Sequence, residues 1–115
     1  MPRTSYAVRP DLVLTEQVPG ALVALTGRLD VSAAADARLA LASAVAAGTG
    51  ELVLDVAGLT AVDATGLGVL VGAHRAAGRA GRTLVLLDVP LPIGRLLFIT
   101  RLSRVLRTAS SASCA

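Results

Sequence analysis

The stretch from Leu52 to Gly72 constrains the fold more than any other part of the chain. It begins with Leu52–Val56, a short apolar run with β-branched residues, which predicts a buried strand. After a brief glycine-containing loop, Asp63 stands where a helix N-cap belongs, and we expect the helix to open on Thr65. The pattern therefore predicts a hydroxyl at the positive end of a helix, next to a carboxylate. A hydroxyl in that place suits a site whose phosphorylation changes what can dock there.

The remaining apolar runs predict further strands at residues 12–14, 21–25 and 83–87, with a turn at Pro19–Gly20 between the first two. Val105–Leu106 is expected to form a brief edge strand. A helical segment separates the strand at 83–87 from the strand at 52–56. The two are therefore expected to be parallel, with a right-handed crossover.

Three helices are expected. The first runs through the alanine-rich stretch to Ala47, with Ser32 as its N-cap and with Ala35, Leu39, Ala42 and Val45 or Ala46 on one side. The second covers about 65–80, and the third, opened by two prolines, covers about 93–100. The order β-β-α-β-α-β-α-β predicts a single α/β domain, in which a mixed sheet of four to five strands packs against helices.

Length and composition agree with one folded domain. The chain has 115 residues, of which 54% are hydrophobic and 17% charged, so we expect one core spanning residues 11–108, with flexible termini at 1–10 and 109–115. Polar residues or glycine interrupt every apolar run before it reaches the roughly 18 residues of a membrane span. No secretory signal is visible, and the one cysteine, Cys114, has no partner for an internal disulfide. We therefore expect a cytoplasmic protein.

The sequence offers little that is typical of an enzyme. His74 is the sole histidine, and no serine, aspartate or cysteine is spaced with it as a catalytic triad or as metal ligands. Glycines at 66, 68 and 72, followed by Asp88, partly match a dinucleotide-binding fingerprint. In that fold the first glycine directly follows the strand, whereas nine residues separate Val56 from Gly66. We therefore expect no catalysis, no metal and no cofactor.

The charge pattern also argues against nucleic-acid binding. All 11 basic residues are arginines, and Tyr6 and Phe98 are the only aromatic residues that could stack on bases. Four arginines gather near the C-terminus at positions 95, 101, 104 and 107. We interpret this cluster as a solvated basic edge, which we favour over a phosphate-binding site.

The glycines of the second predicted helix have two explanations. Thr65, Gly68, Gly72 and Ala76 share one face at helical spacing. The predicted buried stripe of the same helix comprises Leu67, Leu70, Val71 and Ala77. Glycine costs about 1 kcal/mol relative to alanine inside a helix, so two on one face need a reason. Close packing onto the sheet is one reason, and a flat landing site for a partner beside Thr65 is the other.

Three segments resemble STAS domains, and the stand-alone bacterial anti-sigma factor antagonists in particular: Gly27–Asp30, the continuous string Leu52–Gly68, and Leu96–Leu97. The likeness extends over residues 11–108. It implies that Thr65 is phosphorylated by an anti-sigma factor that is also a kinase of the histidine-kinase-like ATPase type. The unphosphorylated protein would bind this kinase and free its sigma factor, and a metal-dependent, PP2C-type phosphatase would reset the phosphorylated form.

The resemblance also implies a partner-binding surface. Asp63 belongs to the motif, and Asp30 lies in the loop that matches the family's partner-facing loop. The other residues expected to contact a partner are Ala64, Gly66, Gly68 and Gly72. The expected partners are proteins, with no direct nucleic acid, and a homodimer stays open.

The motif departs from the family pattern at one informative place. The family often has Asp–Ser–Ser–Gly where this chain has Asp63–Ala64–Thr65–Gly66. Some STAS modules with threonine at this position serve transporters or lipid-export complexes. An adaptor subunit that docks on a transporter or a lipid-export ABC complex, without a phosphorylation switch, is therefore the alternative function.

Overall fold

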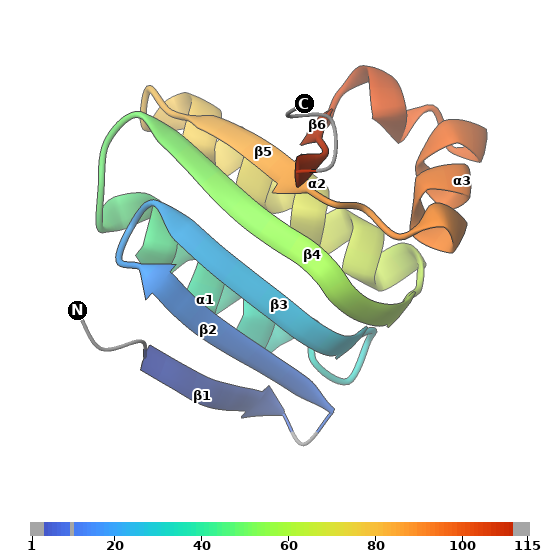
Figure 1. Cartoon of the computed structure of the whole chain (residues 1–115), viewed down its shortest axis with the longest axis horizontal. Coiled ribbons are helices and arrows are strands. Elements are labelled where there is room, and N and C mark those ends of the chain that lie inside the picture. Colours follow the sequence, from blue (N-terminus) through green and yellow to red (C-terminus); the bar gives the residue numbers. More distant parts are fainter. Residues whose placement is uncertain (1–3, 10, 112–115) are drawn as a thin grey trace.

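The computed structural model describes residues 4–9 and 11–111, and its centre is a six-stranded mixed sheet in which the strands follow chain order (Figure 1). The strands are β1 (Thr4–Arg9), β2 (Leu12–Val18), β3 (Leu22–Leu29), β4 (Glu51–Val62), β5 (Thr83–Leu87) and β6 (Arg107–Ala109). β2 pairs antiparallel with both β1 and β3, whereas β3, β4, β5 and β6 pair in parallel. The predicted parallel pairing of the strands around residues 52–56 and 83–87 is confirmed.

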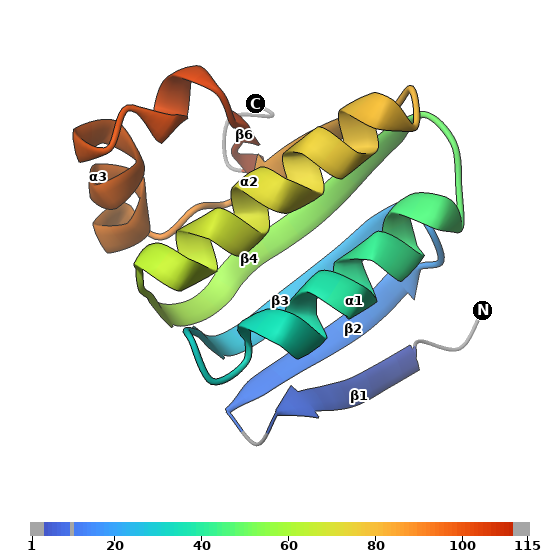
Figure 2. The same cartoon turned by 180° about the vertical axis from the view of Figure 1, so that it is seen from behind.

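Helices cover one face of this sheet. α1 (Ala34–Ala46) and α2 (Ala64–Arg79) lie side by side across it (Figure 2). α3 (Leu91–Ile99) and the short 3-10 helix η1 (Leu102–Arg104) lie beyond the end of β5. Within residues 4–9 and 11–111, no helix is long and apolar enough to cross a membrane. The α/β domain with a mixed sheet packed against helices agrees with the fold expected from the sequence.

The core lies between the sheet and the two long helices. In β4, Leu52, Leu54 and Val56 are buried and alternate with partly exposed residues, as expected for a strand covered on one face. The predicted buried residues of α2 are Leu67, Leu70, Val71 and Ala77, and all but Val71, which is partly exposed, are buried.

The residues predicted to share one side of α1 do not form its buried face. The helix buries Ala34, Ala37, Leu41, Ala44 and Val45, whereas Ala35, Leu39 and Ala42 of the predicted set are exposed. Alanine occupies positions all around this helix, so the apolar pattern has too little contrast to choose a face. The predicted N-cap is also wrong, because Ala33 holds that position without a side-chain hydrogen bond.

The two ends of the described chain contain strands that differ from the prediction. Thr4–Arg9, predicted as part of a flexible lead-in, forms β1 through main-chain pairing with β2. The last strand is β6 at 107–109 rather than at 105–106, and Ser111 is held by hydrogen bonds to Asp88. The sheet therefore has six strands instead of four or five. Residues 1–3, 10 and 112–115 of the predicted flexible termini lie outside the described residues.

β4 is much longer than the predicted strand. It continues through residues 57–62, which were expected to form a loop, and stays paired with β3 through two register shifts. Leu29 at the end of β3 pairs with Val62 at the end of β4. Because these strands are parallel and neighbouring, the segments that follow them emerge at the same edge of the sheet. This arrangement brings Asp30 and Asp63 together.

Candidate functional site

The site begins where β4 ends and α2 starts. Asp63 is the N-cap residue, and its Oδ1 accepts a hydrogen bond from the Gly66 amide at 2.8 Å, as the sequence predicts for this position. The helix starts at Ala64, one residue earlier than expected. Thr65 lies in the first turn with a partly exposed side chain, and its hydroxyl forms no hydrogen bond to any residue that the structure describes. The predicted hydroxyl is therefore present at the helix N-terminus and reachable from solvent.

Asp63 also joins α2 to the loop that follows β3. Its Oδ2 accepts a hydrogen bond from the Val31 amide at 3.1 Å. Both carboxylate oxygens are thus engaged by backbone amides from two different segments. The β3–α1 loop and the first turn of α2 consequently form one continuous surface.

Asp30 organises that loop. One of its oxygens accepts hydrogen bonds from the Ser32 hydroxyl at 2.6 Å and from the Ser32 amide at 3.1 Å, and Arg28 lies 3.6 Å from the other. The hydrogen bond from the Ser32 hydroxyl, assisted by its amide and by the Arg28 guanidinium, holds the pKa of Asp30 below its usual value. Ser32 does not cap α1 because its hydroxyl bonds back to Asp30.

The outward face of α2 is bare. Gly68 and Gly72 are exposed, and a Cβ atom added at either position would meet nothing within 4 Å. Close packing against the described residues is therefore excluded as the reason for these two glycines. Ala64 is exposed on the same side, while Thr65 and Ala76 lie at its margin and are partly exposed.

Gly66 has a different role from the one predicted. It is buried, and an added Cβ would lie 2.1 Å from the Leu29 carbonyl oxygen and 3.0 Å from Cγ1 of Val62. A side chain there would push α2 away from the ends of β3 and β4. The expectation that Gly66 contacts a partner is corrected, because this glycine serves the packing of α2.

A shallow groove runs beside the bare face. Its volume is about 440 Å³, and it separates the first three turns of α2 from the segment after α3. The lining residues are Ala64, Leu67, Gly68, Val71, Gly72, Arg75, Thr100 and Leu102. Three of the residues predicted to bind a partner therefore border one hollow whose walls are mostly apolar. Sequence reasoning missed the contribution of Thr100 and Leu102, since only the tertiary fold brings them to α2.

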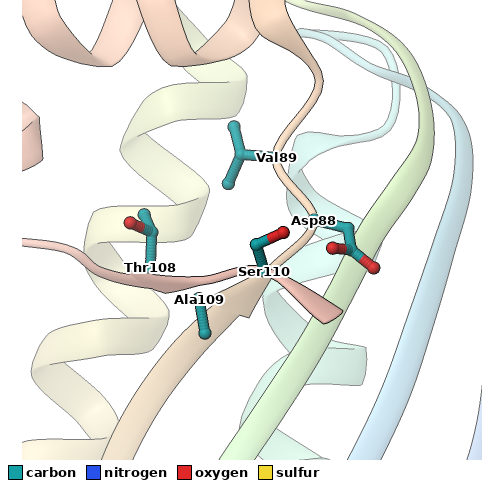
Figure 3. Close-up of a pocket in the computed structure, with 5 residues that line it drawn as sticks. All are labelled: Asp88, Val89, Thr108, Ala109 and Ser110. Carbon is teal, nitrogen blue, oxygen red and sulfur yellow. The ribbon is translucent and has the colours of Figure 1, made fainter. Parts of the chain in front are cut away.

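A second hollow, of about 580 Å³, lies at the end of β5 and β6 (Figure 3). Asp88 is its one charged lining residue, and the hydroxyl and amide of Ser111 donate hydrogen bonds to the carboxylate at 2.7 and 2.8 Å. These bonds lower the pKa of Asp88 and fasten the end of the described chain to the sheet. In the described part of the chain, no group of three or more histidines, cysteines or carboxylates could hold a metal ion.

Comparison with known proteins agrees with this fold. A family model described as "Mlab, STAS domain" matches residues 14–108. An anti-sigma factor antagonist from Mycobacterium paratuberculosis superposes with a TM-score of 0.70 at 18% identity, covering 93% of this chain and 85% of that chain. The antagonist SpoIIAA in its unphosphorylated form gives a TM-score of 0.63 at 20% identity, covering 85% and 86%. Phosphorylated SpoIIAA from Bacillus gives 0.59 at 19% identity, covering 96% and 94%.

These structural likenesses show the shared fold, and no curated protein sequence matches the chain. The family model spans most of the domain, from β2 to β6, and includes the Asp63–Gly66 motif. The chain belongs to the STAS domain family.

Proposed function

We propose that this protein is an anti-sigma factor antagonist and that phosphorylation at Thr65 switches it off. In its unphosphorylated form it binds an anti-sigma factor that is also a kinase of the histidine-kinase-like ATPase type, and the sigma factor is released. The observation that carries the proposal is the bare face of α2 beside Thr65, where two glycines have no neighbour that would require them. The role is regulatory, without catalysis by this chain.

The glycines argue for a partner because they weaken the helix without improving its packing. Each costs about 1 kcal/mol relative to alanine in a helix interior. Gly68 and Gly72 both lie within α2, and a methyl group at either would meet open space. A cost that the fold does not recover is explained if another protein approaches the helix backbone closely at this face.

Phosphorylation of Thr65 would change binding without unfolding the domain. A phosphate adds about −1.5 to −2 charges at neutral pH. At the start of α2, the amides of Ala64 and Thr65 have no acceptor within the helix, and the helix dipole favours a negative charge there. A partner seated on the small, mostly apolar groove would instead meet a hydrated dianion. A loss of about 4 kcal/mol in binding free energy weakens association roughly a thousandfold.

The neighbouring carboxylates extend the proposed docking surface. Asp63 adjoins Thr65, and its bond to Val31 holds the loop of Asp30 beside the helix N-terminus. We assign Asp30, Asp63, Ala64, Gly68 and Gly72 to partner contact. A PP2C-type phosphatase would remove the phosphate and restore binding.

Incubation of the protein with its cognate kinase and ATP, followed by intact-mass and peptide analysis, tests the proposal. We expect one added phosphate on Thr65 and no phosphate on Thr65→Ala, which still captures the kinase. Thr49→Ala is the matched control, because Thr49 is an exposed threonine in the loop before β4. A phosphate that maps to Ser32 or Ser43 overturns the assignment.

A second candidate function uses the same surface without a switch. The chain would then be an adaptor subunit that docks on a transporter or a lipid-export ABC complex. Threonine at position 65 favours this candidate, as does the "Mlab" description of the matching family model. Under this alternative, Thr65 is not phosphorylated, and the protein recovered with the chain is a permease or its ATPase rather than a kinase.

A further inference from the structure

The charges of the chain are unevenly distributed. Residues 1–88 contain seven arginines and eight aspartates or glutamates, whereas residues 89–115 contain four arginines and no acidic side chain. The four arginines are Arg95, Arg101, Arg104 and Arg107, and all are exposed. None of them forms an ion pair or a side-chain hydrogen bond with the residues 4–9 and 11–111. Their positive charge is therefore uncompensated within the described fold.

The same region exposes large apolar side chains. Ile93 and Leu97 of α3 point into the core, which accounts for one face of this helix. On the opposite face, Leu91 is 69% exposed, Phe98 is 76% exposed and Ile99 is 75% exposed. A helix that is apolar on both faces is ordinarily covered on both. Here the described chain covers only one.

The apolar and basic residues form one patch, which we call the α3–η1 surface. It comprises Leu91, Arg95, Phe98, Ile99, Arg101 and Arg104. Phe98, Ile99, Arg101 and Arg104 line a hollow of about 340 Å³ together with Ser103. Both views show α3 at a corner of the molecule, away from α1 (Figures 1 and 2). α3 therefore lies at the periphery of the molecule rather than between other elements.

We propose that the α3–η1 surface docks on an anionic phospholipid membrane. Aromatic and aliphatic side chains flanked by arginines are the composition of helices that lie in the interface between headgroups and acyl chains. Guanidinium groups bind phosphate oxygens bidentately, and basic residues near an anionic leaflet strengthen its attraction for the protein. The proposal assigns a role to the arginine cluster that the phosphorylation switch leaves unused, and it does not depend on Thr65.

Charge decides against a second copy of this chain as the occupant. If two such patches faced each other, Arg95, Arg101 and Arg104 would meet their own like charges, without a carboxylate on either surface to offset them. An occupant must instead bring negative charge around an apolar interior. The interface of an anionic membrane has both properties, and it is planar, as a projecting helix face requires.

Flotation of the full-length protein with phospholipid vesicles tests this proposal. We expect binding to phosphatidylcholine vesicles with about 30% phosphatidylglycerol, weaker binding at about 0.5 M salt, and little binding to phosphatidylcholine alone. Arg101→Gln/Arg104→Gln should lower the partition coefficient by roughly 30-fold, and Phe98→Ser/Ile99→Ser by about tenfold or more. All these side chains are exposed, so circular dichroism should show unchanged folding.

A matched control lies on α1. Arg38→Gln/Leu39→Ser removes the same kinds of side chain from another exposed place, since Leu39 is 71% exposed. We expect this variant and Thr65→Ala to bind vesicles like the parent. The proposal is overturned by an absence of binding to anionic vesicles, by equal loss in the α1 control, or by a dimer in light scattering that Phe98→Ser abolishes. Binding only to an acidic protein would likewise assign the surface to a protein partner.

Discussion

The two ends of the parallel part of the sheet are built in opposite ways. At the end where β4 and β5 start, Arg82 is 5% exposed, and its guanidinium donates to backbone carbonyls of Ala44, Val45, Gly50 and Gly20. At the other end, Asp30 and Asp63 use their carboxylates to hold short surface segments. At the first end the polar side chain is buried, whereas at the second end the carboxylates lie around the partly exposed Thr65.

This contrast separates the part of the molecule that maintains the fold from the part that can meet a partner. The Arg82 bonds join the last turn of α1, at the carbonyls of Ala44 and Val45, to the turn before β3. The Asp63 bonds instead fix the shape of a surface and leave the Thr65 hydroxyl unengaged among the described residues. Substitutions at the first end should change stability most, and substitutions at the second should change binding most.

The largest expected effect is that of Arg82→Met. It removes the guanidinium donor from several buried carbonyl groups, so we expect a loss of about 3 kcal/mol in the free energy of unfolding. The melting temperature should fall on the order of 10 °C. Arg79→Met is the control, because Arg79 is exposed, and it should change stability by less than about 0.5 kcal/mol. Equal melting temperatures for the two variants would show that the Arg82 bonds contribute little.

Gly66 and Gly68 of α2 allow a residue that maintains the fold to be compared with a surface residue of the same helix. Gly66→Ala should destabilise the protein by about 2 kcal/mol, because its Cβ would lie 2.1 Å from the Leu29 carbonyl oxygen. Gly68→Ala should stabilise it by up to about 1 kcal/mol, because its Cβ meets open space in α2. Urea unfolding of both variants measures the difference. If both substitutions changed the free energy of unfolding in the same direction, this would contradict the assignment of Gly66 to packing and of Gly68 to the surface.

How much of this arrangement could be predicted depends on whether the signal is local. The strand at Leu52–Val56 and the helix from Asp63 to about residue 80 could be predicted, since their apolar spacing and the N-cap residue are read directly from neighbouring positions. Residues 57–62 between them were wrongly expected to form a loop. Most residues of the candidate site could therefore be predicted, because the predicted N-cap and helix contain Asp63, Thr65, Gly68 and Gly72.

The features that were missed depend on distant contacts. Nothing in the residues around Arg82 indicates that its guanidinium reaches carbonyls 31 to 62 positions away. β1 forms by main-chain pairing on the edge of β2, which leaves no apolar pattern to read. Gly66 looks like Gly68 in the sequence, and only the position of the Leu29 carbonyl distinguishes them.

A smaller effect is expected from Asp63. Asp63→Ala removes the N-cap of α2 and the acceptor for the Val31 amide, at a cost of about 1 to 2 kcal/mol. Asp63→Asn keeps an oxygen that can accept from Gly66 and should lose less. Hydrogen exchange of the Val31 amide reports the second bond separately, and unchanged exchange in Asp63→Ala would contradict the link between loop and helix.

The smallest effect is expected from Asp30 and appears in its pH dependence. The folded-state pKa of this carboxyl is lowered, so its contribution to stability is present above the ordinary value of 3.8 and is lost as the pH falls through the folded value. Asp30→Asn should therefore be slightly less stable than the parent near neutral pH, and the two should converge in acid. If the stabilities of the two proteins stayed parallel down to acid pH, the contacts of Asp30 with Ser32 and Arg28 would be excluded as the cause of its lowered pKa.

The proposal that a partner protein docks on the bare face of α2 is tested most directly with Gly72→Arg. This substitution places a large charged side chain on that face. Affinity capture from native cell extract should recover a histidine-kinase-like ATPase with the parent protein and not with this variant. Its melting temperature should remain within about 2 °C of the parent, because the position opens to solvent. Recovery of the ATPase by the variant, or a melting temperature far below that of the parent, would contradict a docking role for this face.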